Sequence, residues 1–264
     1  MEKSKFTSFL KRIITSLVLI PVVIGCIIIG YPTIFLLAMT AAALLSWEWA
    51  NMVPNSRPAF YAVCYFFVAA VAILLKPLVV PLTVMLLALA VATCKSKGEA
   101  HRKMLLLGIP YIAIGIGSIV SIYMAYGPYI VLWFVFLVWG VDIGGYFVGT
   151  TLKGPKLAPK ISPNKTWSGL LGGVLLSVLI SYGIMAIFKV SAAVTVYYLV
   201  MAAVLAVIAQ IGDLIESFIK RRLGIKDSSN LIPGHGGIFD RIDGLIFAAP
   251  FAYLMLVNLA RIVK

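Results

Sequence analysis

Apolar stretches long enough to cross a lipid bilayer recur along almost the whole chain, and they constrain its fold more than any other feature. A bilayer core about 30 Å thick is spanned by about 20 apolar helical residues. Only 12% of the 264 residues are charged and 62% are hydrophobic, whereas soluble domains carry about 25% charged residues. The sequence therefore predicts an all-α, polytopic integral membrane helix bundle with about nine transmembrane helices, at residues 13–30, 33–52, 60–75, 77–93, 104–126, 129–151, 167–188, 194–216 and 244–260. The third and fourth segments are short, and Lys76 and Pro77 alone separate them, so their division stays open.

The basic residues predict how these segments are oriented. The chain has 22 Lys and Arg against 9 Asp and Glu, a formal charge of +13. With nine spans, 18 of the 22 basic residues fall on the side of the N-terminus. Because Lys and Arg concentrate in cytoplasmic loops, we expect a cytoplasmic N-terminus and an external C-terminus in a bacterial-type inner membrane. The positive charge then requires no nucleic acid partner. The first segment follows basic residues as a signal peptide does, but we expect a retained span because similar segments recur.

The connections between the segments differ greatly in length. Residues 30–32 and 127–128 are little more than turns on the predicted external side. On the cytoplasmic side, residues 152–166 and 217–243 form long loops that hold most of the polar chemistry, and loops on a rigid scaffold are where function usually resides. We expect one transmembrane catalytic domain over residues 1–264, with spans 1–4 in residues 1–103 and spans 5–9, carrying the active site, in residues 104–264.

Acidic residues inside predicted spans are candidates for function, because an ionisable group in the bilayer costs several kcal/mol unless it faces water or the protein interior. Asp142 lies about nine residues, or roughly 13 Å, below the cytoplasmic end of its span. It must face a cavity or a partner; the alternative is a buried Asp that only bonds a neighbouring helix. Three glycines permit close helix packing nearby, at Gly144, Gly145 and Gly149.

Glu48 is a second acidic residue in a predicted span, between Trp47 and Trp49. Tryptophans gather at membrane interfaces. Two interpretations stay open: Glu48 belongs to an interfacial belt, or it supports the functional site.

The end of the segment 194–216 carries a polar face. Asp213, Glu216, Ser217 and Lys220 are spaced i, i+3, i+4 and i+7, which places them on one side of a helix. Carboxylates that hold a cation, followed by basic residues that meet an anion, suit a metal ion beneath a phosphate chain. The basic residues are Lys220, Arg221 and Arg222. An ordinary basic cap at a helix end explains Arg222 but not Asp213.

The segment IPGHGGIFDRID, residues 232–243, adds glycines, acids and a histidine. Backbone amides of a turn at Gly234, Gly236 and Gly237 can approach phosphate oxygens, and His235 can donate a hydrogen bond. Asp240 and Asp243, three residues apart, could both bind a divalent cation, which leaves Arg241 for a phosphate.

The segment KISPNKTWSG, residues 160–169, places Ser162, Asn164, Lys165 and Thr166 just before a predicted helix. A helix N-terminus with a nearby Lys is a natural anion site. The alternative is a basic cytoplasmic loop that ends in a helix N-cap.

Residues 217–243, SFIKRRLGIKDSSNLIPGHGGIFDRID, closely resemble the signature of the phosphatidate cytidylyltransferase (CDP-diacylglycerol synthase) family. The resemblance implies Mg²⁺-dependent transfer of a cytidylyl group from CTP to phosphatidate, which gives CDP-diacylglycerol and pyrophosphate. CTP, phosphatidate and the lipid bilayer are the implied partners; a second cation and a homo-oligomer stay open. The implied signature positions are Ser217, Lys220, Arg221, Lys226, Asp227, Pro233, His235, Gly236, Gly237, Asp240, Arg241 and Asp243.

Together these observations give a set of expected site residues in three roles. The expected catalytic residues are Asp213, Lys220, Arg221, Asp240 and Asp243. The expected metal ligands are Asp142, Asp213, Asp240 and Asp243. The expected ligands of CTP or of the lipid phosphate are Ser162, Asn164, Lys165, Thr166, Ser217, Lys226, Asp227, His235, Gly236, Gly237 and Arg241.

Two other functions compete with this interpretation. A CTP-dependent lipid kinase would use similar phosphate-binding loops but would need a general base, for which Asp142 or Asp213 is the candidate. A transporter would use the buried acids as an ion path and predicts repeats and interrupted helices. The sequence shows no internal repeat.

Overall fold

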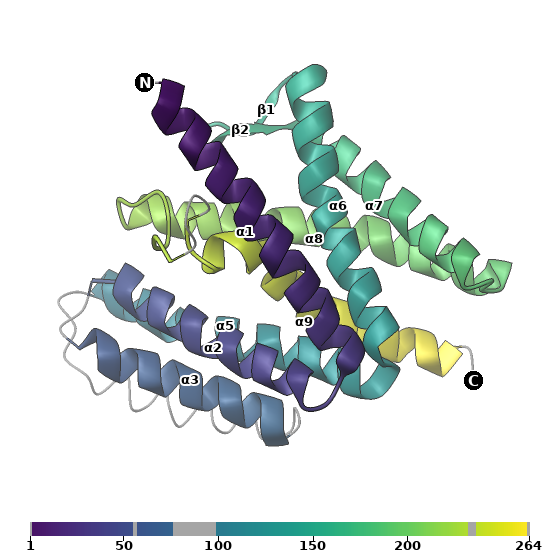
Figure 1. Ribbon diagram of the computed structural model, residues 1–264, viewed down its shortest axis with the longest axis horizontal. Helices are drawn as coiled ribbons and strands as arrows, with labels where there is room; N and C mark the ends of the chain where they lie inside the picture. Colours follow the sequence, from purple (N-terminus) through teal and green to yellow (C-terminus); the bar gives the residue numbers. More distant parts are fainter. Residues whose placement is uncertain (1, 55–56, 76–98, 232–235, 263–264) are drawn as a thin grey trace. The chain divides into compact units, whose positions relative to one another are not determined.

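The computed structural model describes residues 2–54, 57–75, 99–231 and 236–262, and almost all of its regular structure is helical (Figure 1). The predicted segment 77–93 lies outside the described residues. The helices are α1 (Glu2–Ile29), α2 (Thr33–Met52), α3 (Pro58–Leu75), α5 (Glu99–Tyr126), α6 (Pro128–Thr151), α7 (Trp167–Ile187), α8 (Ala192–Arg222) and α9 (Phe239–Ile262). The other predicted segments each correspond to a helix, but α1 begins 11 residues before the predicted segment 13–30, and α8 ends six residues after the predicted segment 194–216.

Six helices among the described residues are long and apolar enough to cross a membrane: α2, α5 from Lys103, α6, α7, α8 and α9 to Arg261. Shorter apolar stretches lie in α1, at Leu17–Ile29, and in α3, at Pro58–Val71. Many large apolar side chains on these helices are exposed, including Leu171, Leu175 and Leu179 on α7. Lipid is the solvent that suits such a surface. The protein is an all-α, multi-pass membrane protein.

Glycines end two helices where the chain turns directly into the next one. Gly30 follows α1 with φ of +88°, and Gly127 follows α5 with φ of +82°. The Gly127 amide donates to the Tyr123 carbonyl at 2.9 Å. A residue with positive φ after a helix is usually glycine because a Cβ is strained there. These short connections are those that the sequence predicted.

The chain falls into two compact units, Met1–Pro128 with Leu223–Ile242, and Tyr129–Arg222 with Asp243–Lys264. These limits differ from the predicted division at residue 103. The single catalytic domain stays a prediction.

In the first unit, α2 packs against α3 and α5 (Figure 1). Trp49 on α2 lies over Gly108 on α5, where a Cβ would be 2.7 Å from Trp49 Cε2. Its indole donates to the Met104 carbonyl at 3.1 Å. Tyr65 on α3 likewise donates to the Leu105 carbonyl at 2.8 Å. Buried aromatic rings therefore hold these three helices together, and each finds a partner for its polar atom.

In the second unit, α6 and α7 cross through glycines. A Cβ on Gly144 would lie 2.5 Å from the Gly172 carbonyl oxygen, and a Cβ on Gly173 would lie 2.8 Å from that of Val141. Ser177 on α7 donates to the Leu137 carbonyl at 2.8 Å. Small residues and a hydroxyl bond across the interface are typical of helix pairs in membranes. The predicted close packing at the α6 glycines is confirmed.

A small antiparallel hairpin connects α6 to α7 where the sequence predicted only a loop. It consists of β1 (Lys156–Ala158) and β2 (Ser162–Thr166), with Lys156 opposite Thr166 and Ala158 opposite Ser162. Thr166 ends β2 and caps α7, because its hydroxyl accepts the Gly169 amide at 3.1 Å. The strands are too short for sequence periodicity to indicate them.

Candidate active site

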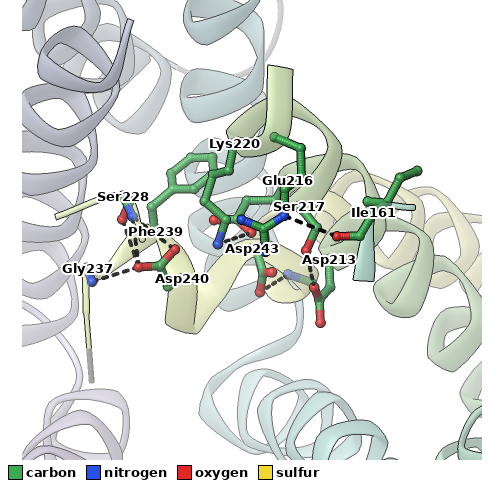
Figure 2. Close-up of polar contacts among 12 residues, drawn as sticks. Ile161, Asp213, Glu216, Ser217, Lys220, Ser228, Gly237, Phe239, Asp240 and Asp243 are labelled. Carbon is green, nitrogen blue, oxygen red and sulfur yellow. Dashed lines mark hydrogen bonds and ion pairs between the residues drawn. The ribbon is translucent and has the colours of Figure 1, made fainter. Parts of the chain in front are cut away.

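Three carboxylates in the second unit form the centre of the candidate site. One carboxylate oxygen from each of Asp213, Glu216 and Asp243 lies within 4.8 Å of the other two (Figure 2). Asp213 and Glu216 come from α8, one turn apart, and Asp243 comes from α9. Glycines let the two helices approach, since a Cβ on Gly212 would lie 2.5 Å from Phe247 Cβ. We call these three residues the carboxylate cluster.

The carboxylate cluster has the donors that a hard divalent cation prefers. All three side chains offer oxygen atoms, the ligands of Mg²⁺ and Ca²⁺. Glu216 is 2% exposed, and carboxylates gathered at such short range repel one another in a medium of low dielectric constant. A cation among them would remove that repulsion. The donor set therefore fits a metal ion.

Two lysines already neutralise part of this negative charge. Lys220 Nζ lies 2.8 Å from Glu216 Oε2, one turn further along α8. Lys165 on β2 forms an ion pair with Asp213 Oδ2. Both lysines are mostly buried, with side chains 10% and 20% exposed. Acidic and basic groups thus alternate in one small region, an arrangement suited to a cation and a phosphate together.

Ser217 and Arg221 complete the polar face of α8. The Ser217 hydroxyl donates to Asp213 Oδ1 at 3.3 Å. Arg221 Nε donates to the Ile161 carbonyl at 3.4 Å, which joins the end of α8 to the hairpin (Figure 2). Arg222 lies over the Phe218 ring at 5.0 Å. The spacing predicted from the sequence is therefore present as one continuous helical face.

The other expected residues of the hairpin and of α6 differ in how far their side chains are exposed. Thr166 is buried as the cap of α7, Ser162 is half-buried and Asn164 is exposed. Asp142 on α6 is exposed and is not a member of the carboxylate cluster. Its assignment as a metal ligand stays a prediction.

Asp240, in the first unit, binds backbone and hydroxyl donors of its own loop. Its Oδ2 accepts the Gly237 amide at 2.8 Å, the Ser228 amide at 3.0 Å and the Ser228 hydroxyl at 3.1 Å (Figure 2). These bonds join the two ends of the segment that precedes α9. These contacts give Asp240 a role in shaping this loop, and its role as a metal ligand stays a prediction.

The remaining signature residues lie mainly on the surface of this loop. Lys226, Asp227 and Arg241 are exposed, and Gly236 has φ of +85°. A Cβ on Gly237 would lie 2.7 Å from Glu48 Oε1. Pro233 and His235 lie outside the described residues.

Sequence reasoning omitted two features of the site. Glu216 was noted on the polar face of α8 but was not among the expected metal ligands, although its spacing from Asp213 was the available signal. For Glu48 the sequence leaves two interpretations open, because nothing local to α2 indicates which distant residues it contacts.

Comparisons with known proteins identify the family. The model of the cytidylyltransferase family matches residues 10–259. The phosphatidate cytidylyltransferase of Brucella suis is 50% identical over 118 residues, which cover 45% of this chain and 43% of that protein. Over that stretch the chain spans less than half of the relative's length.

Two relatives match over nearly their full length. The phosphatidate cytidylyltransferase of Rickettsia felis is 30% identical, over 97% of this chain and 96% of that protein. That of Pseudomonas aeruginosa is 36% identical, over 93% of this chain and 96% of that protein. The chain, with its carboxylate cluster on membrane-spanning helices, belongs to the cytidylyltransferase family.

Proposed function

We propose that this protein is a phosphatidate cytidylyltransferase, an enzyme that transfers the cytidylyl group of CTP to phosphatidate. The observation that carries the proposal is the carboxylate cluster on α8 and α9, with Lys220 of α8 and Lys165 of the hairpin beside it, in a chain of the cytidylyltransferase family. The products are CDP-diacylglycerol and pyrophosphate. Phospholipid synthesis in a bacterial inner membrane is the setting.

The reaction forms one phosphorus–oxygen bond and breaks another. A phosphate oxygen of phosphatidate attacks the α-phosphorus of CTP, and the bond from that phosphorus to the bridging oxygen of the β-phosphate breaks. The attacking oxygen is already anionic at neutral pH, so no strong general base is required. The main obstacle is repulsion between the lipid phosphate and the triphosphate, which basic residues and a cation can reduce.

The carboxylate cluster would hold the cation, which we propose to be Mg²⁺. When bound, Mg²⁺ supplies positive charge that offsets the developing negative charge of phosphoryl oxygens. Lys165 and Lys220 lie at the cluster and are placed to bind phosphate oxygens beside it. Ser217 orients Asp213 through its hydrogen bond. A second cation, and metal binding by Asp142 and Asp240, are further parts of the proposal that rest on the sequence.

The signature segment, residues 217–243, and the hairpin contribute the proposed substrate contacts. From the family resemblance we propose that CTP or the lipid phosphate is bound by Lys226, Asp227, His235, Gly236, Gly237 and Arg241, and that Arg221 is catalytic. The position of the hairpin before α7 supports the same binding role for Ser162, Asn164 and Thr166. CTP is a cytosolic metabolite too polar to cross a bilayer. We therefore propose nine spans with a cytoplasmic N-terminus, an external C-terminus and an active site that faces the cytoplasm, as the distribution of Lys and Arg predicts.

Labelled CTP tests the reaction directly. The purified protein, in micelles that contain phosphatidate and diacylglycerol and in a buffer that contains Mg²⁺, receives CTP labelled either in the cytosine ring or in the γ-phosphate. Cytidylyl transfer puts the ring label into lipid and releases the γ label as pyrophosphate. Transfer of the γ label to lipid would instead identify a lipid kinase, and label in neither product would refute both. Reactions without phosphatidate are the control.

A further inference from the structure

Glu48 lies in the interior of the first unit although it belongs to an apolar helix. It is 0% exposed, and its neighbours differ: Trp47 is 45% exposed and Trp49 is 1% exposed. A buried carboxylate is costly unless hydrogen bonds replace the water that it loses. Glu48 therefore needs several well-formed hydrogen bonds.

Four donors meet the two carboxylate oxygens of Glu48. Oε1 accepts the Ser229 hydroxyl at 2.6 Å and the Ile238 amide at 2.9 Å. Oε2 accepts the Phe239 amide at 2.7 Å and the Ser228 hydroxyl at 3.3 Å. Each oxygen thus receives one backbone amide and one hydroxyl. The two amides are fixed donors, so both oxygens of Glu48 must act as acceptors.

We call residues 228–231 and 236–240 the signature loop. Ser228 and Ser229 lie at its start, and Ile238 and Phe239 lie where it leads into the first turn of α9. The amides of a helix's first turn have no partner within the helix, and a carboxylate there is favoured by the helix dipole. Glu48 therefore closes the loop and caps α9, from a helix 180 to 191 residues away in the sequence.

Aromatic packing at the same place provides an independent observation. The Phe239 ring lies 5.3 Å from that of Trp49 and 5.4 Å from that of Tyr111, and Phe239 is 1% exposed. A Cβ on Gly237 would lie within 2.9 Å of both Glu48 oxygens. Only a glycine backbone comes this close, so the loop is fitted to this carboxylate.

The Glu48 contacts extend to Asp240 through Ser228. The Ser228 hydroxyl lies near both carboxylates, at 3.3 Å from Glu48 Oε2 and 3.1 Å from Asp240 Oδ2. Gly237 likewise lies near both carboxylates, because its backbone is close to the Glu48 oxygens and its amide donates to Asp240. Glu48 and Asp240 thus bind the loop from two sides.

We propose that Glu48 is a positioning residue for the cytidylyl transfer reaction, holding residues 228–231 and 236–240 in the conformation that binds CTP. This inference rests on the proposed function. Glu48 is buried under the loop and acts through it. When a loop is in its binding conformation only part of the time, the apparent dissociation constant of the ligand equals the intrinsic constant divided by the fraction of protein in that conformation. Loosening the loop should therefore raise the KM for CTP, and saturating CTP should restore the rate.

Glu48→Gln is the decisive variant. Either orientation of the amide places an NH₂ group against a backbone N–H of residue 238 or 239, so one of the two fixed donors loses its acceptor. We expect the KM for CTP to rise about tenfold or more, as loss of a charge-assisted hydrogen bond implies, with kcat little changed. Hydrogen exchange, measured without substrate, should accelerate in peptides that cover residues 236–240 and stay unchanged in α3.

Two further variants keep the test decisive. Ser46→Ala is the matched control, because Ser46 is buried on the same helix and its hydroxyl has no hydrogen-bond partner among the described residues; it should leave KM and exchange unchanged. Ser229→Ala removes one donor and keeps the carboxylate, and should raise the KM for CTP by less than Glu48→Gln does. If Glu48→Gln does not fold, an unchanged KM in Ser229→Ala overturns the proposal.

The outcomes separate this proposal from the proposed function. A wild-type protein that transfers no cytidylyl group contradicts the function, yet the exchange measurement still reports whether Glu48 holds the loop. Wild-type KM and exchange in Glu48→Gln overturn the positioning role. A lower kcat with unchanged KM and faster exchange throughout α2, α3 and α5 would show general destabilisation and overturn it as well.

Discussion

Lys165 on β2 forms an ion pair with Asp213 on α8, so one lysine of the hairpin lies directly against the carboxylate cluster. Asp213 also accepts the Ser217 hydroxyl. A cation at the cluster would compete with Lys165 for Asp213, and a phosphate bound beside that cation would offer the lysine a new partner. On the proposed function, this relationship would couple metal binding and phosphate binding through Lys165.

Replacing Lys165 with Ala should weaken catalysis and strengthen binding of the cation. Loss of one charge-assisted contact costs about 1.5 to 3 kcal/mol, which lowers kcat/KM by roughly ten- to more than a hundredfold. Calorimetry of the substrate-free protein should show tighter Mg²⁺ binding, because Asp213 loses its competing partner. Lys160→Ala is the control, since Lys160 is exposed at the turn of the same hairpin. Equal rates in wild type and Lys165→Ala would leave residues 152–166 as a topology determinant only.

Asp243→Asn should nearly abolish turnover while the protein stays folded in detergent. The substitution removes one charge from the carboxylate cluster with almost no change in volume, so Mg²⁺ binding should weaken in calorimetry as well. Glu216→Gln should behave in the same way. Near-normal activity of Asp243→Asn at saturating Mg²⁺ would contradict the metal assignment.

Two glycine-to-alanine substitutions on α7 should separate the effect of helix packing on stability from the effect of helix propensity. At Gly173 an added Cβ would lie 2.8 Å from the Val141 carbonyl oxygen, whereas at Gly183 it would meet nothing within 4 Å. Overpacking costs about 1 to 3 kcal/mol, so Gly173→Ala should lower the midpoint of thermal unfolding. Gly183→Ala should leave it unchanged or raise it, because Ala favours a helix over Gly by about 1 kcal/mol. The reverse order would mean that α6 and α7 do not pack as described.

Accessibility of single cysteines should establish the orientation in the membrane. Cys26, Cys64 and Cys94 are first replaced by Ser, and one cysteine is then introduced at Asn230 or Lys264. Asn230 is exposed, whereas the neighbouring Ser228 is buried and is unsuited to labelling. A membrane-impermeant thiol reagent applied to intact cells should label position 264 and spare position 230, which should react after the cells are opened. Labelling of position 230 from outside would place the signature loop away from CTP.

The sequence by itself determined the features that depend on neighbouring residues. Apolar length predicted the apolar part of each described helix, because a span is stabilised along its own length. It missed the polar start of α1, which begins 11 residues before the predicted segment. Helical spacing placed Asp213, Glu216, Ser217 and Lys220 on one face of α8. The period of 3.6 residues per turn is a property of a single helix and does not depend on neighbouring elements. The signature segment and the family were likewise recognisable from consecutive residues.

The tertiary structure decided which distant groups meet. Glu48 receives donors from residues 180 to 191 positions later, and Asp243 joins Asp213 and Glu216 where Gly212 lets α9 approach α8. The ion pair of Lys165 with Asp213 depends on the hairpin, whose strands are too short to leave a pattern. Such contacts are set by how close two helices or strands can pack, and this depends on the side chains of both partners together.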